Sequence, residues 1–290
     1  MLDYEKLRRW NSGEVRHAFT AKDAMLYALG VGMGQDPMDR DELRYVTEGE
    51  LRVLPSMAAV LSHPGFWMRD NREMGIDFVR LVHGEQSIRL HQSLPGGGTI
   101  LGQSRVTRVV DKGEGKGALV HVQKRLVDAA SGALLATCDS TVFCRGDGGF
   151  SAKGGGDPPG NAPRPTPDRA PDQMIDLQTR PEQALLYRLS GDINPLHSDP
   201  DVAARAGFER PILHGLATFG VACRGLLKGF CNYDPDRLRS ISARFSAPAF
   251  PGDLIRLECW KDGNDVAFRA RVPARDSIVL SHGHAVCTGG

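Results

Sequence analysis

The chain has 290 residues, and its 36 basic residues nearly balance its 35 acidic ones, for a formal net charge of +1. This balance gives no support for general binding to nucleic acid or to a membrane surface, and no apolar run reaches the roughly 18–20 residues of a membrane span. The length favours about two domains, each large enough to bury its own core.

The cysteines and the two ends of the chain bear on its cellular compartment. Six cysteines form no CxxC pair, so we interpret them as reduced core residues rather than as a disulfide framework. The first residues, MLDYEKLRRWNSGEV, contain no apolar signal core, and the last, VCTGG, do not match a peroxisomal SKL-type address. These features together predict a cytoplasmic location.

In the first half of the chain, helical patterns precede strand patterns. Thr20 and Asp23 mark a helix start, and glycines at 30, 32 and 34 end that helix. Residues 50–63 carry a short apolar helical run. Four segments of strand character, separated by glycine-containing turns, follow between residues 79 and 144. Four successive strands predict an antiparallel sheet.

The composition changes sharply between residues 146 and 172. Seven glycines and six prolines occur in these 27 residues, which cannot bury a core and are therefore predicted to be a linker. Fully extended, such a linker reaches ~90 Å, enough to cross a whole domain. We therefore divide the chain into a first domain (1–145), a linker (146–172) and a second domain (173–290).

The second half repeats the order of the first. Apolar residues at steps of three and four predict a long helix from about Leu213 to Phe230. Glycines at 215, 220, 225 and 229 are costly in an exposed helix, but they are suitable if a sheet wraps closely around it. Four strand-like runs follow this helix. A buried helix enclosed by a curved antiparallel sheet is expected here.

The sequence also repeats internally, at an offset of 160 residues. Tyr-x-Leu occurs at 27–29 and again at 187–189. The same alignment shows that the first copy lacks the chemical groups of the second, so we expect one site per chain. Asp192, Asn194 and His197 correspond to Gly32, Gly34 and Pro37, respectively.

The stretch from 187 to 216 carries the densest set of polar groups. Pro195 fixes its own backbone and biases Asn194 away from the helical region, so Asp192 and His197 converge only if the loop folds back. Asp199 and Pro200 then predict the start of a short helix over 201–206.

Two motifs in this stretch resemble a known family. YRLSGDINPLH at 187–197 and PILHGL at 211–216 are similar to segments of the R-specific enoyl-CoA hydratases, the MaoC-like "hydratase 2" enzymes. This resemblance implies an α+β double hot-dog fold. It comprises two fused domains, each a curved antiparallel sheet around a central helix, with a first domain that lacks catalytic residues and shapes the acyl pocket.

The resemblance also implies chemistry, the reversible hydration of trans-2-enoyl-CoA to (R)-3-hydroxyacyl-CoA. Asp192 and His197 would activate a water, Asn194 would orient water or substrate, and the backbone N–H of Gly215 would bind the thioester oxygen. No metal and no organic cofactor are required, and the partner is an acyl-CoA, with a homodimer as a further expectation. Separately, we hypothesise that Arg239 and Arg244 contact CoA phosphates.

Several alternatives remain open from the sequence. The enzyme could be a pathway-specific dehydratase of a branched or dicarboxylic acyl-CoA, a thioesterase, or an acyl-thioester binding module. A thioesterase commonly has an acidic residue on the central helix, and none occurs between His214 and Phe230. His214 itself is interpreted as a capping or packing residue. His282 and His284 could bind a metal, but no third ligand is evident nearby.

Overall fold

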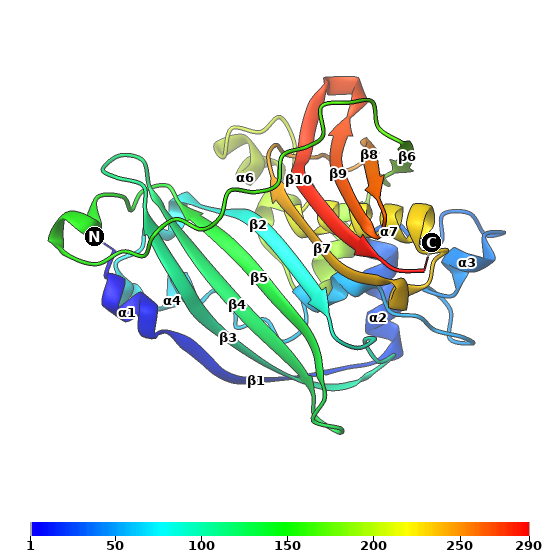
Figure 1. The fold of residues 1–290 in the computed structure, drawn as a ribbon, viewed down its shortest axis with the longest axis horizontal. Coiled ribbons are helices and arrows are strands. Elements are labelled where there is room, and N and C mark those ends of the chain that lie inside the picture. Colours follow the sequence, from blue (N-terminus) through cyan, green and yellow to red (C-terminus); the bar gives the residue numbers. More distant parts are fainter. Residues whose placement is uncertain (1, 290) are drawn as a thin grey trace.

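The structure is a computed structural model, and it describes residues 2–289. Within these residues ten strands form one antiparallel sheet in the order β1-β3-β4-β5-β2-β7-β10-β9-β8-β6, which confirms the expected antiparallel architecture (Figure 1). The strands are β1 (Asn11–Phe19), β2 (Leu81–Leu90), β3 (Gly98–Asp111), β4 (Ala118–Asp128), β5 (Leu134–Cys144), β6 (Gln173–Gln178), β7 (Leu238–Phe245), β8 (Leu254–Asp262), β9 (Asp265–Val272) and β10 (Ser277–Cys287).

The helices are short, with a single exception. They are α1 (Tyr4–Arg9), α2 (Ala21–Gly30), α3 (Arg40–Leu43), α4 (Trp67–Asp70), α5 (Gln183–Tyr187), α6 (Pro200–Arg205) and α7 (Gly215–Phe230). In the described part of the chain, no helix has the length and apolar character needed to cross a membrane.

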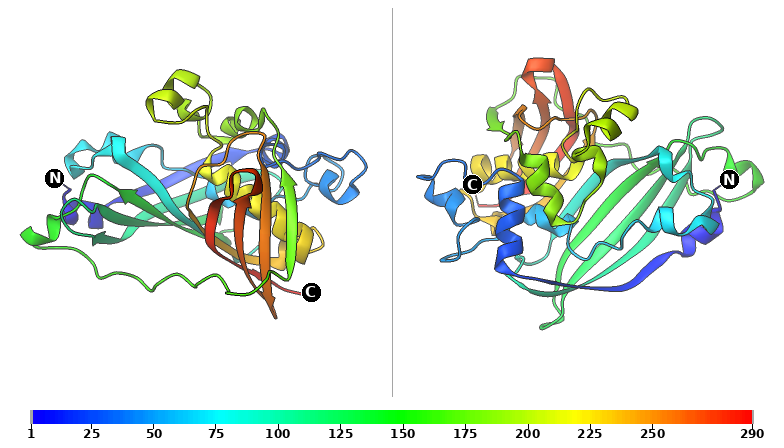
Figure 2. Two further views of the ribbon diagram at one scale, coloured as in Figure 1. Left: turned by 90° about the horizontal axis from the view of Figure 1, so that it is seen from above. Right: turned by 180° about the vertical axis from the view of Figure 1, so that it is seen from behind.

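Helix α7 is the buried centre of the second half, as the glycine spacing predicts. The strands from β7 to β10, with β6 at the edge, curve around it (Figures 1 and 2). A Cβ atom at Gly225 would lie 2.7 Å from Leu177, and one at Gly229 would lie 2.5 Å from Ile175. Leu177 and Ile175 both belong to β6, so these glycines let the strand pack directly on the helix backbone.

The corresponding helix of the first half is much shorter than the apolar run over 50–63 suggested. Only a five-residue 3₁₀ helix, η1 (Pro55–Ala59), forms there. Two features end it. The Lys124 ammonium donates to the main-chain oxygens of Ala59 and Leu61, at 2.8 and 2.5 Å, and Ser62 adopts a left-handed φ of 49°. The sheet of the first half therefore has no long helix to fill its concave face.

The two halves join along one seam. Strands β2 and β7 pair antiparallel, with Glu85 opposite Arg244 and Arg89 opposite Ser240, so the two half-sheets are continuous. On the inner side α2 packs against α5, and the rings of Tyr27 and Tyr187 lie 5.8 Å apart. The two copies of the Tyr-x-Leu segment thus lie side by side across the seam.

The segment between β5 and β6 crosses the outer side of the molecule as an extended strap (Figures 1 and 2). Beyond the short 3₁₀ helix Phe150–Lys153 it contains no helix or strand among the described residues. It is anchored at several points, since Asp157 donates its N–H to Val109 and Trp260 donates its indole N–H to Arg169. The division into domains at 146 and 172 remains a prediction.

A buried ion pair joins the halves beside Gly32 and Gly34. Arg224 of α7 donates two hydrogen bonds to Glu42 of α3, at 2.9 and 2.8 Å. Glu42 also accepts from the N–H of Gly34, and a Cβ at Gly32 would lie 3.0 Å from the Arg224 guanidinium. Since Gly32 and Gly34 align with Asp192 and Asn194, an ion pair between the halves lies where the duplicate site would be.

This pair generates a stability prediction with an internal control. We expect Glu42→Gln to lower the free energy of unfolding by ~3–5 kcal/mol, because it leaves the buried Arg224 charge uncompensated. Glu85→Gln removes an ion pair with Arg244 that also joins the halves but is about one-third to two-fifths exposed. It should therefore cost less than ~1 kcal/mol. Urea unfolding measures both, and equal losses in the two variants would contradict the prediction.

Candidate active site

The loop after α5 folds back through local hydrogen bonds. Gly191 adopts a φ of 123°, which side chains other than hydrogen disfavour. The Asp192 carboxylate accepts from the N–H of Asn194 at 3.1 Å, and the Asn194 side-chain oxygen accepts from the N–H of Leu196 at 3.0 Å. These two turns, with Pro195 starting a 3₁₀ helix, bring Asp192 and His197 to the same side of the loop as the sequence requires.

Two histidines hold this loop against the start of α7. Nδ1 of His197 lies 2.9 Å from the main-chain oxygen of Ile212, and Nε2 of His214 lies 3.0 Å from that of Asp192. A carbonyl only accepts, so each of these nitrogens carries the proton of a neutral ring. The remaining nitrogens, Nε2 of His197 and Nδ1 of His214, therefore present lone pairs.

The two imidazoles and the Asp192 carboxylate form one cluster. The rings of His197 and His214 stack with centroids 3.7 Å apart, and one polar atom from each of the three residues lies within 4.8 Å of the others. Nδ1 of His214 is buried and has no partner among the described residues. Three acceptors facing one another can bind a water that donates two hydrogen bonds. Two histidine nitrogens and a carboxylate are also a set of ligands found in zinc sites.

Burial keeps both rings neutral at neutral pH. It lowers the pKa of His214 to about 4, with the neighbouring His197 as a further cause. Burial also lowers the pKa of His197, which the Asp192 charge and the Ile212 carbonyl partly offset. A neutral imidazole beside a carboxylate is the state that can accept a proton from water.

The N-terminus of α7 lies beside this cluster. Gly215 is the first residue of the helix and is exposed, and its N–H has no acceptor among the described residues. An unpaired N–H in the first turn of a helix points along the positive end of the helix dipole. It can therefore donate to an oxygen that gains negative charge.

A cavity runs from Asp192 under the sheet of the first half. It measures about 210 Å³ and adjoins an open, mostly apolar groove of about 600 Å³, with which it shares His63, Trp67, Met68 and Val142. The groove also contains Ile193, Asn194 and Pro195 of the loop that carries Asp192 and His197. The concave space that the short helix η1 leaves open thus connects the site to solvent.

The structure does not bring every predicted residue to this place. Asp192, Asn194, His197 and Gly215 lie together, but Arg244 bonds Glu85 and lines a cavity with the strap, and Arg239 is exposed near Asp236. Along β7 Arg244 alternates with the core residues Ile241 and Ala243 and so faces the outer side of the sheet, whereas Arg239 lies near the exposed start of the strand. Their contact with CoA remains a prediction.

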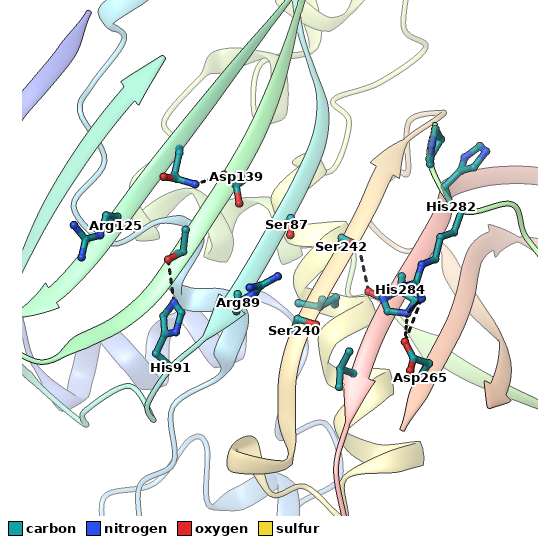
Figure 3. Close-up of a pocket in the computed structure, with 16 residues that line it drawn as sticks. Ser87, Arg89, His91, Arg125, Asp139, Ser240, Ser242, Asp265, His282 and His284 are labelled. Atoms are coloured by element: carbon teal, nitrogen blue, oxygen red, sulfur yellow. Dashed lines mark hydrogen bonds and ion pairs between the residues drawn. The ribbon is translucent and has the colours of Figure 1, made fainter. Parts of the chain in front are cut away.

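The outer side of the sheet carries a separate groove of about 740 Å³, shown in Figure 3. His282 and His284 line it, but His284 pairs with Asp265 at 2.6 Å and with Arg164 of the strap. Neither histidine belongs to a cluster of metal-binding groups among the described residues. This groove contains none of the residues of the Asp192 cluster.

Two parts of the site go beyond what the sequence indicates. The capping or packing role expected for His214 agrees with its place as the N-cap residue of α7, and the structure adds that its ring stacks on His197. The cavity residues of the first half were not identified. The alternating pattern of β4 could have identified one of them. Lys124 occupies an inward position in this pattern, in line with Val120, Val122 and Leu126.

The fold defines a class, namely a double hot-dog protein, in which Asp192, His197 and His214 form a polar cluster at the start of α7. Residues 163–281 match the family model of the MaoC like domain, and residues 17–146 match that of the MFE-2 hydratase 2 N-terminal domain. The chain is 38% identical over 288 residues to a protein of Arabidopsis thaliana named enoyl-CoA hydratase 2, peroxisomal, with 92% of this chain and 90% of the relative covered.

Solved structures agree with this assignment. A MaoC-like dehydratase from Phytophthora capsici is 32% identical, with a TM-score of 0.85 over 100% of both chains. A Mycobacterium tuberculosis protein described as having a double hotdog fold matches at a TM-score of 0.53, with 14% identity over 93% of this chain and 92% of that one, and supports the fold alone. The chain belongs to the MaoC-like hydratase 2 family, which confirms the resemblance and the fold class.

The buried histidines predict how stability depends on pH. The pKa of His214 is about 4 in the folded protein, below the usual 6.5, so the unfolded chain binds a proton first as the pH falls. The stability that this difference confers is complete above pH 6.5 and is lost as the pH falls toward 4. Melting temperatures should therefore drop over this range, and less steeply in His214→Asn than in wild type.

The exposed His91 provides the matched control, and His91→Asn should leave the slope of melting temperature against pH unchanged. A His214→Asn variant with the full wild-type slope would show that this ring does not bind protons as inferred.

Proposed function

We propose that the protein is a hydro-lyase that reversibly hydrates trans-2-enoyl-CoA to (R)-3-hydroxyacyl-CoA. The observation that carries the proposal is the cluster of Asp192, His197 and His214, which presents only acceptors beside the free N–H of Gly215. Membership of the hydratase 2 family supports the same reaction, and the name of the Arabidopsis relative states an enoyl-CoA hydratase.

In the proposed mechanism one water lies between Asp192 and His197. Its oxygen attacks the β-carbon as one of its protons passes to this pair, and the electrons of the double bond move toward the thioester oxygen. The N–H of Gly215 stabilises the negative charge that develops there. A proton then passes from the pair to the α-carbon, so that the elements of water are added with no net change in the enzyme.

Asn194 and His214 act as positioning residues in this scheme. The Asn194 side-chain oxygen is engaged by the N–H of Leu196, so its remaining amide group is the part available to water or substrate. His214 holds the main chain of Asp192 and stacks on His197, so its ring sets the relative position of the two groups that move protons.

The first domain shapes the acyl pocket in this proposal. The cavity beside Asp192 is lined mainly by residues of the first half, and none of the aligned catalytic positions there retains a catalytic group. The acyl chain would extend into this cavity from the thioester. The CoA moiety would then lie toward the open groove along Ile193 and Pro195.

The other functions have less support. No acidic residue occurs on α7, where many thioesterases of this fold have one, and a binding module has no need of an Asp–His pair. A branched or dicarboxylic substrate remains compatible with the same chemistry. A homodimer and a cytoplasmic location also remain proposals, and the Arabidopsis relative is named as peroxisomal.

Activity should be found with crotonyl-CoA as a decrease in the absorbance of the enoyl thioester, without release of free CoA. Chiral analysis of the product should give the (R)-alcohol. Prior treatment with a chelator should leave the rate unchanged, because the proposed water is held by protein groups alone. Release of CoA would indicate a thioesterase, an (S) product would place the stereochemistry outside the proposal, and no reaction with any enoyl-CoA would overturn it.

The Asp–His pair predicts a pattern of mutant rates. Asp192→Asn and His197→Gln should each lower kcat by at least ~10²-fold, because each removes a group that accepts or donates a proton. The double variant should be little slower than either single one, since the two groups act on one water. Asn194→Ala should be impaired less. Steady-state kinetics of the four variants measure this, and a wild-type rate in either single variant would contradict the assignment.

A further inference from the structure

The cavity beside Asp192 is more polar than an alkyl chain requires. Its floor is formed by inward-facing positions of the first-half sheet, where the pairing register places Ser104 opposite Lys124 and Val122 opposite Ser140. Gln86 pairs with Ser140 on the next strand and lines the same space. Polar side chains from four strands thus form one side of the pocket, while Trp67, Met68, Val142 and Leu216 provide apolar contacts.

Lys124 is the cation of this floor. Its side chain lies in the interior, and the residue is 7% exposed. Two of its three N–H groups donate to the main-chain oxygens of Ala59 and Leu61, and among residues 2–289 no carboxylate forms an ion pair with it. Lys124 also lines the cavity that contains Asp192.

The energetics of this arrangement depend on what enters the cavity. Burial lowers the pKa of Lys124, because desolvation disfavours its charge, and its hydrogen-bond partners are two neutral carbonyl oxygens. An unbranched alkyl chain would displace water from the ammonium and offer no partner in return. An anion in the cavity would use the third N–H and neutralise the buried charge.

We propose that Lys124 selects acyl chains that carry a second acidic group, so that the preferred substrate is the mono-CoA ester of a dicarboxylic 2-enoic acid. This inference rests on the proposed hydration. The inference adds the chemical class of the acyl chain to the proposed reaction. The reacting end lies at Asp192 and the free carboxylate lies at Lys124, both of which line the same cavity.

The test compares three esters of matched chain length from six to twelve carbons. They are the plain 2-enoyl-CoA, the same chain with a terminal carboxylate, and the methyl ester of that carboxylate, which keeps the size and removes the charge. In wild type the acid should exceed its methyl ester in kcat/KM by ~10- to 100-fold at the length that reaches Lys124, the range expected for a hydrogen bond between charged groups.

Two variants separate charge from structure. In Lys124→Met the ratio of acid to methyl ester should fall to near one. In Lys22→Met, which removes an exposed lysine that does not line the cavity, the ratio should stay at the wild-type value. If Lys124→Met does not fold, as judged by its melting curve, Lys124→Gln keeps a donor for the two carbonyls and carries the same expectation.

The outcomes are distinct. Hydration of crotonyl-CoA with no preference for acid over methyl ester at any length would overturn the role of Lys124 and leave the proposed reaction intact. A preference that survives in Lys124→Met or Lys124→Gln would place the acid-binding group elsewhere and also overturn it. Absence of hydration with every ester would overturn the proposed reaction and this inference together.

Discussion

The pairing of β2 with β7 is the interaction on which the rest of the molecule depends. It makes ten strands into one sheet and thereby sets the concave face of the first half against the N-terminus of α7. Neither half has a complete site. In the proposed reaction the second half supplies the groups that handle protons, and the first half lines most of the cavity beside them.

The two halves have diverged in how they use equivalent positions. In the second half, a loop carrying Asp192 and His197 is bonded to the start of a long helix. In the first half, glycines stand at the aligned positions, and the space is filled by the Glu42–Arg224 ion pair. The short η1 helix completes the asymmetry, because it removes the element that would otherwise fill the first half's concave face. The second half thus carries the cluster of Asp192, His197 and His214, and the first half lines most of the adjacent cavity.

Main-chain carbonyls determine the chemical state of the site. The oxygens of Ile212 and Asp192 each fix one ring nitrogen of a histidine as a donor, which leaves the other as an acceptor. Burial then keeps both rings neutral. The result is a cluster whose acceptors are already assembled, so that the proposed deprotonation of a water would need little reorganisation.

The sequence alone determined the duplicated architecture, the long helix and the spacing of Asp192, Asn194 and His197, because these follow from local periodicity and turn chemistry. It also indicated that the first copy has no catalytic groups. Only the tertiary structure decided which residues meet across the chain. His214 stacks on His197, Arg244 faces the outer side of the sheet, and Lys124 lies under the cavity beside Asp192. These contacts depend on strand register and on the seam between the halves, which a local pattern does not specify.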